Sequence, residues 1–146
     1  MVDLSVKSSA FEQGKLIPKK YTCDGQDINP PLTVEEIPKE AKTLVLAVDD
    51  PDAPSGTWDH WIVWNIPAST SKIAENSVPG KEGVNSAKQQ GYMGPCPPGG
   101  THRYFFKVYA LDTELSLGAT SRKKDVEKAM QGHILAKGEL MGLYRR

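Results

Sequence analysis

Three apolar runs, rich in β-branched and aromatic residues, stand out from the polar pattern of the rest of the chain. They are TLVLAV (residues 43–48), WIVWNI (residues 61–66) and RYFFKVYAL (residues 103–111). Short runs of this composition between turn residues are typical of buried strands. In the third run, alternate residues are expected on opposite faces of the strand. Those faces are Tyr104, Phe106, Val108 and Ala110 on one side, and Phe105, Tyr109 and Leu111 on the other.

Weaker patterns predict shorter elements around these three strands. Residues 4–7 alternate apolar and polar side chains, as a half-buried strand does. A short strand is expected to begin at Thr33 and to end before Pro38, and residues 143–145 are a candidate last strand. Residues 68–90 are polar and interrupted by glycine and proline, so they are predicted to be a long surface connection.

The C-terminal third has the pattern of one or two short helices. Ser121 is a suitable N-cap for a helix over residues 122–131. Val126, Ala129 and Met130 have the i, i+3, i+4 spacing of an apolar helix face. Residues 133–140 are predicted to form a second short helix, with His133 as a structural residue.

Together these elements predict a mainly β protein. The length of 146 residues suits one domain with a sizeable core, so we expect a single domain over residues 1–146. Its expected architecture is a β-sandwich with a large central sheet, a smaller sheet and one or two short C-terminal helices. Trp61 and Trp64 are expected in the core.

The charge balance narrows the classes of partner. Lys plus Arg and Asp plus Glu are both 18, so the net charge is zero and a large basic face for nucleic acid is not expected. No apolar run approaches the length that spans a membrane, and the N-terminal residues lack the pattern of a signal peptide. The sequence therefore predicts a cytoplasmic protein, in which Cys23 and Cys96 would be free, small, buried residues.

Two polar, proline-rich stretches flank the predicted central strands. They are VDDPDAPSGTWDH (residues 48–60) and GPCPPGGTHRY (residues 94–104). We expect the two loops to meet and form one small pocket, with Asp50, His60 and His102 as its charged centre. The prolines remove backbone donors and stiffen both loops, and an X-Pro bond there can be cis. Trp58 and Tyr104 are candidate aromatic walls.

This set of side chains suits a small anion. Two imidazoles near a carboxylate can adjust their charge near neutral pH, and loop N–H groups can donate to phosphate. Asp49 and Asp52 are expected to accept N–H bonds within their turn, and Arg103 to be a structural ion-pair partner.

Three competing chemistries start from the same residues. Two histidines and a carboxylate can hold a divalent metal, although their spacing is not that of a known ligand set. Cys96 and His102 can be read as a nucleophilic thiol and its base. A hydrolase that uses a histidine as general base is the third alternative, but the sequence contains no cofactor motif.

The same segments resemble the phosphatidylethanolamine-binding protein family, and most of all its shorter bacterial and archaeal branch. The resemblance rests on DPDAP (residues 50–54), WDHW (58–61) and GPCPPGGTHRYFFKVYALD (94–112), supported by INPPL (28–32) and GHILAKGELMGLY (132–144). It implies a β-sandwich with one surface pocket for phosphate, acetate or a phosphorylated headgroup. The implied pocket residues are Asp50, Pro54, Trp58, His60, Pro97, Pro98, His102 and Tyr104.

The resemblance also implies a class of function. Family members are described as binders of lipid headgroups and as inhibitors of kinases or serine proteases. We therefore expect a protein that binds a small phosphorylated or carboxylate ligand, without a cofactor, a resident metal or a catalytic residue. A serine protease or a kinase is the expected protein partner, and a monomer or weak homodimer the expected oligomeric state.

Overall fold

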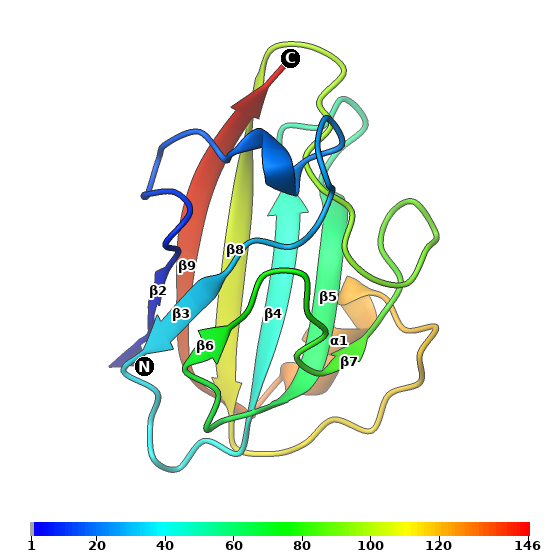
Figure 1. Ribbon diagram of the computed structural model, residues 1–146. Helices are drawn as coiled ribbons and strands as arrows, with labels where there is room; N and C mark the ends of the chain where they lie inside the picture. Colours follow the sequence, from blue (N-terminus) through cyan, green and yellow to red (C-terminus); the bar gives the residue numbers. More distant parts are fainter. Residues whose placement is uncertain (1) are drawn as a thin grey trace.

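The computed structural model describes residues 2–146, which form two β-sheets and one α-helix (Figure 1). The large sheet has six strands in the order β1-β9-β8-β4-β5-β7, and the small sheet has three in the order β2-β3-β6. This confirms the predicted mainly β sandwich. The bounds are β1 (Val2–Asp3), β2 (Ser5–Lys7), β3 (Leu32–Glu35), β4 (Thr43–Asp50), β5 (Trp58–Pro67), β6 (Lys72–Ile73), β7 (Lys81–Glu82), β8 (Thr101–Leu111), β9 (Ile134–Arg145), α1 (Lys123–Met130) and a 3₁₀ turn (Lys19–Tyr21).

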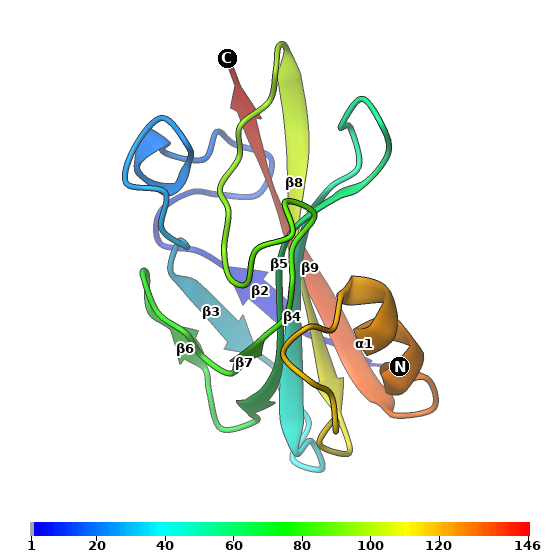
Figure 2. The ribbon, with the colours of Figure 1, turned by 90° about the vertical axis from the view of Figure 1, so that its right-hand side faces the viewer.

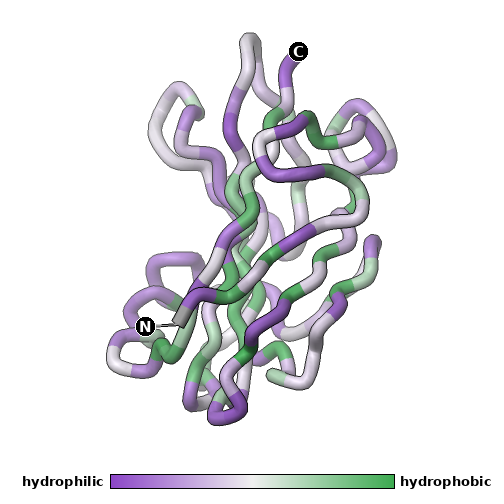
Figure 3. Tube along the Cα trace, turned by 90° about the vertical axis from the view of Figure 1, so that its left-hand side faces the viewer, coloured by the Kyte–Doolittle hydropathy of each residue, from purple (hydrophilic) through white to green (hydrophobic). Residues whose placement is uncertain are grey.

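The three predicted central strands form the middle of the large sheet. All eight residues of β4 are buried, because the sheet is covered on both faces. The small sheet covers one face and α1 the other (Figure 2). Trp61 packs in the apolar cluster between the sheets and Trp64 in the cluster beneath α1, as the predicted core requires. Hydrophobic positions follow these strands, and hydrophilic ones gather in the connections (Figure 3).

The strands that lead into the site are longer than predicted. β4 continues to Asp50 and β5 already begins at Trp58, so the connecting loop is only residues 51–57. Asp50 lies opposite Trp58 in the register of the two strands. His60 and His102 are likewise on strands β5 and β8, so the sheet itself holds the chemistry-bearing side chains in place.

The predicted first C-terminal helix is present as α1. Val126 and Met130 are buried and Ala129 packs against their cluster, which confirms the predicted face. The N-cap is Arg122 rather than Ser121, and the Asp125 carboxylate accepts the N–H of Arg122 at 2.9 Å.

The predicted second helix over residues 133–140 is wrong. That segment belongs to β9, which pairs with β8 from Thr101 to Leu111 and also contains the predicted strand at 143–145. Gly138 and Gly142 explain the error, since they alternate with buried Ala136 and Leu140 along the strand. A Cβ at Gly142 would lie 2.6 Å from Ile17 Cγ1, so close packing requires glycine where an apolar residue would have revealed the strand.

Residues 68–90 are more ordered than the predicted surface connection. They contain β6, which pairs with β3, and β7, which pairs with β5. Asn85 is buried in the connection after β7, where its side chain binds the backbone of Ala87, Gln89 and Gly91.

The prediction of two free, buried cysteines is also wrong. Cys23 and Cys96 form a disulfide with an S–S distance of 2.05 Å, and both residues are exposed. They are 73 residues apart in the sequence and their loops meet only in the fold, where the N–H of Cys23 donates to the Pro95 carbonyl at 3.2 Å.

Two further features of the described chain are the isomers of its peptide bonds and the length of its helix. The X-Pro bonds of the described chain are trans, since residues 2–146 contain no cis peptide. The one α-helix within this range is too short to cross a membrane.

Candidate functional site

One cavity of about 260 Å³ lies where the 51–57 loop, the segment after Met93 and the start of β8 meet. The structure brings all eight residues of the implied pocket to its wall. It adds four that the sequence reasoning missed. The full lining is Asp50, Ala53, Pro54, Ser55, Trp58, His60, Met93, Cys96, Pro97, Pro98, His102 and Tyr104.

Asp50 and His102 form a buried pair at the base of this cavity. His102 Nδ1 lies 2.7 Å from Asp50 Oδ2, and their side chains are only 9% and 5% exposed. Asp50 Oδ1 also accepts the N–H of Asp52 at 2.8 Å. Because the carboxylate accepts from Nδ1, the Nε2 atom of His102 is the ring nitrogen left for a ligand.

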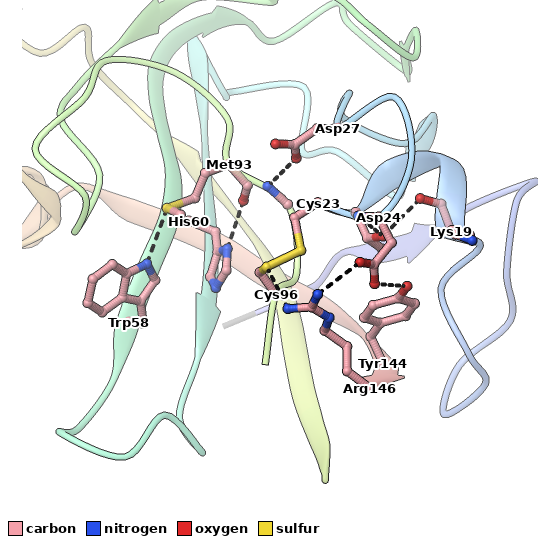
Figure 4. Close-up of a disulfide and its surroundings, with 12 residues drawn as sticks. Lys19, Cys23, Asp24, Asp27, Trp58, His60, Met93, Cys96, Tyr144 and Arg146 are labelled. Atoms are coloured by element: carbon pink, nitrogen blue, oxygen red, sulfur yellow. Dashed lines mark hydrogen bonds and ion pairs between the residues drawn. A yellow bond between two sulfur atoms is a disulfide. The ribbon is translucent and has the colours of Figure 1, made fainter. Parts of the chain in front are cut away.

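His60 is held in a similar way by a backbone carbonyl. Its Nδ1 donates to the Met93 carbonyl oxygen at 2.7 Å, which leaves Nε2 to interact with a ligand (Figure 4). Burial lowers the pKa of His60, although the hydrogen bond to Met93 and the charge of Asp50 oppose this shift. The imidazole is therefore neutral near pH 7, and a bound anion would favour its protonation.

Tyr104 packs against both imidazoles and has an unused hydroxyl. Its ring lies 5.3 Å from the His60 ring and 6.4 Å from the His102 ring, measured between centroids. The residue is 1% exposed, yet its hydroxyl has no hydrogen-bond partner among the described residues. Burial, the charge of Asp50 and the approach of the hydroxyl to the Asp50 carboxylate, which falls outside hydrogen-bond geometry, raise the pKa of Tyr104 well above its ordinary value, so the hydroxyl keeps its proton. A buried donor without a partner is costly, and a ligand oxygen would supply that partner.

The remaining wall is apolar. Pro54, Pro97 and Pro98 line it together with Trp58, whose Nε1–H donates to Met93 Sδ at 3.2 Å. Met93 thus orients both Trp58 and His60, a role that its place in a glycine-rich loop did not reveal. Among residues 2–146 no lysine or arginine lines the cavity, so the positive charge that its lining residues can supply comes from imidazole protonation.

The acidic residues beside Asp50 have different roles from those predicted. Asp52 accepts bonds from Arg103, through the backbone N–H at 2.9 Å and through the guanidinium, which lowers the pKa of Asp52 to about 2. Arg103 is thus the ion-pair partner that the sequence predicted. The Asp49 carboxylate does not accept N–H bonds within the turn, because it pairs with Lys107 and Lys123 on the opposite face of the sheet. His133 lies away from the cavity and pairs with Asp112 at 2.8 Å.

Two of the competing chemistries find little support in this geometry. Across residues 2–146, no three His, Cys, Asp or Glu side chains converge in a way that could hold a metal ion. Cys96 is bonded to Cys23, so the alternative of a thiol nucleophile does not apply to this state of the protein.

A family model described as phosphatidylethanolamine-binding protein matches residues 7–145 of this sequence. The chain therefore belongs to the phosphatidylethanolamine-binding protein family, as the sequence motifs indicated.

Relatives occur in both archaea and bacteria. A UPF0098 protein of Methanothermobacter thermautotrophicus is 48% identical, over 98% of this chain and 99% of its own. The UPF0098 protein PH1269 of Pyrococcus horikoshii is 51% identical, over 95% of this chain and 75% of its own.

Two solved structures have the same fold. The family homologue CT736 from Chlamydia trachomatis superposes with a TM-score of 0.96 at 45% identity, covering 100% of this chain and 99% of that one. YbcL from Escherichia coli superposes with a TM-score of 0.90 at 28% identity, covering 99% of both chains.

Proposed function

We propose that this protein binds a small anion, a phosphate, phosphorylated headgroup or carboxylate, in the cavity between His60 and His102. The observation that carries the proposal is the buried Tyr104 hydroxyl, which lacks a partner and lies beside both imidazoles. A ligand oxygen placed there would accept from Tyr104 and contact two ring nitrogens that the protein leaves unused. Membership of the family supports the same class of ligand.

The charges of the cavity narrow the ligand further. Asp50 is negative and no lysine or arginine of the described residues lines the cavity, so a fully ionised dianion such as sulfate gains compensating charge only when it binds together with a proton on an imidazole. A monoanion, or an anion that carries a proton to His60 Nε2, suits the site better. The proline and tryptophan walls would accommodate an apolar substituent on that anion.

Replacing Tyr104 with phenylalanine is expected to weaken phosphate binding roughly ten- to hundredfold, because a hydrogen bond to a charged group contributes about 1.5–3 kcal/mol. The free energy of unfolding should stay unchanged or rise, since the substitution removes a donor that has no partner in the free protein. Calorimetric titration and urea denaturation measure the two quantities. Tyr109→Phe, on the same strand and outside the cavity, is the matched control. Equal phosphate affinity of the Tyr104→Phe and wild-type proteins would contradict the proposal.

The affinity for sulfate is expected to rise about tenfold as the pH falls from about 7.5 to 5.5. The sign follows from His60: burial lowers its pKa in the free protein, and a bound anion raises it again, so binding takes up a proton. Sulfate is the suitable probe because its own charge is constant over this range. His60→Gln should flatten the profile and His133→Gln should not. A profile that is the same in His60→Gln and wild type would assign the proton uptake elsewhere.

We further propose that the protein acts through binding rather than as an enzyme. The His102–Asp50 pair could orient a general base, but no hydroxyl in the described chain donates to either imidazole, and Cys96, the cysteine of the cavity wall, is in a disulfide. Inhibition of a serine protease or kinase through the loops around the cavity, as a monomer or weak homodimer, stays a prediction. A panel of both enzyme classes at micromolar protein tests it, and absence of inhibition would remove it.

The cytoplasmic location also stays a prediction, and the disulfide bears on it. Exposed disulfides are rare in a reducing cytoplasm, except as redox-sensing bonds or in hyperthermophiles. Alkylation of free thiols in freshly lysed cells, followed by mass analysis, would show which state of Cys23 and Cys96 the protein has in its own compartment.

A further inference from the structure

The disulfide is part of the wall of the cavity. Cys96 lines the cavity next to Pro97 and Pro98, and its partner Cys23 belongs to the turn that follows the 3₁₀ segment. Figure 4 shows the disulfide together with His60 and Met93, which line the same cavity as Cys96. A change in this bond would therefore act directly on residues of the proposed ligand site.

The wall segment has few other attachments. Before it, Gly94 N–H donates to Asp27 Oδ1 at 2.7 Å and Pro95 accepts from Cys23; after it, β8 begins at Thr101. Between these points, residues 96–100 make no backbone–backbone hydrogen bond within the described chain. The disulfide and a 3.4 Å contact from Arg146 Nη1 to Cys96 Sγ are the side-chain ties of this segment.

The bond is also open to attack by an external thiol. Both cysteines are exposed, so a dissolved thiolate can reach them. The Arg146 guanidinium lies against Cys96 Sγ and is held there by Asp24 at 3.3 Å. A neighbouring cation stabilises a thiolate, and a stabilised thiolate is the better leaving group. Attack is therefore favoured at Cys23 Sγ, with Cys96 as the sulfur that departs.

We propose that Cys23–Cys96 is a thiol–disulfide exchange site for a dithiol reductant, and that its redox state sets the affinity of the adjoining cavity. The proposed effect on affinity rests on the proposed anion-binding function. One thiolate of the dithiol attacks Cys23 Sγ, the S–S bond breaks and Cys96 leaves as a thiolate. The second thiol of the reductant then displaces Cys23, so the dithiol becomes a disulfide and its two electrons and two protons pass to the protein cysteines. Residues 96–100 lose their covalent tie, and the preorganised proline wall is loosened.

Phosphate titration of the oxidised protein, and of the same protein reduced with dithiothreitol, tests whether the redox state changes the affinity. Reduction is expected to weaken binding roughly tenfold, because a mobile wall must be ordered again by the ligand. The Cys23→Ser/Cys96→Ser variant should bind as the reduced protein does and should not respond to dithiothreitol. Exchange rates of the Cys23 and Gly94 amides, which donate to Pro95 and Asp27 beside the disulfide, give a readout that needs no ligand, and they should rise on reduction.

The outcomes separate this inference from the proposed function. Phosphate binding that is equal in both redox states, with unchanged amide exchange, would overturn the inference and leave the proposed function standing. Absence of binding in the oxidised protein would overturn the proposed function together with the proposed redox effect on affinity. The amide exchange rates would then test whether the disulfide holds the wall segment in place. Faster exchange on reduction supports this, and unchanged exchange overturns it.

The direction of attack has its own test. Arg146→Met is expected to slow reduction by dithiothreitol several-fold, because the departing Cys96 thiolate loses its cation. Arg145→Met removes the same charge from the preceding residue and should leave the rate unchanged. Equal rates in Arg146→Met and wild type would overturn the assignment of Cys96 as the departing sulfur.

Discussion

Replacing His102 with alanine is expected to weaken sulfate binding by at least about a hundredfold. The substitution leaves the Asp50 carboxylate, only 5% exposed, without its 2.7 Å partner at the base of the cavity. An unpaired negative charge some 4–5 Å from an anion opposes binding by roughly 3–4 kcal/mol for each unit of charge on the anion, at an effective dielectric constant near 20. The lost Nε2 contact adds to this effect. Calorimetric titration at constant pH measures the change, with circular dichroism as the control for folding.

A second substitution distinguishes charge from damage to the fold. In the His102→Ala background, Asp50→Asn removes the unpaired charge. The double variant should bind sulfate at least tenfold more tightly than His102→Ala alone. A double variant that binds sulfate as weakly as His102→Ala alone would contradict this electrostatic account of the site.

Replacing Asp49 with asparagine is expected to lower the free energy of unfolding by about 2–3 kcal/mol, or the melting temperature by roughly 6–10 °C. Asp49 is 2% exposed and binds Lys107 and Lys123 at 3.1 Å each, while Lys123 also binds Asp59 at 2.8 Å. Burial disfavours the charge of Lys123, but these carboxylates outweigh that and raise its pKa. The pairing attaches α1 to the sheet. Breaking it costs less than a fully buried pair would, because the lysines can regain water.

The control for this prediction is an exposed ion pair. Asp112 and His133 are both 44% exposed, so Asp112→Asn should change stability by no more than about 0.5 kcal/mol. The effect of Asp49→Asn should also persist in 0.5 M NaCl (roughly 4 Å screening length), since salt screens buried pairs only weakly. A melting temperature within about 1 °C of wild type would show that the Asp49 pairs contribute little.

The central strands and the cavity were predictable for different reasons. The first two apolar runs were predictable because almost all of their residues are buried, and the third because buried positions alternate along it with less buried ones. The pocket followed from two proline-rich stretches that adjoin these strands and from the family resemblance of their motifs. Their residues do surround one cavity, although Asp50, His60 and His102 lie on strands rather than in loops.

The features that could not be predicted depend on contacts between distant segments. The glycines of β9 erase the alternating pattern, because Leu4, Phe11 and Ile17 pack against positions that leave no space for a side chain. The disulfide joins loops that only the fold brings together. Met93 orients His60 and Trp58 through a carbonyl and a sulfur, neither of which has a signature in the sequence.

The central claim, that the cavity binds a small anion, is tested most directly by an amide NMR titration of the oxidised wild-type protein with phosphate near neutral pH. We expect saturable shifts confined to residues 50–60 and 94–104, the two segments whose side chains meet at His60, His102 and Tyr104. Shifts that do not saturate, or that lie outside these segments, would contradict the account.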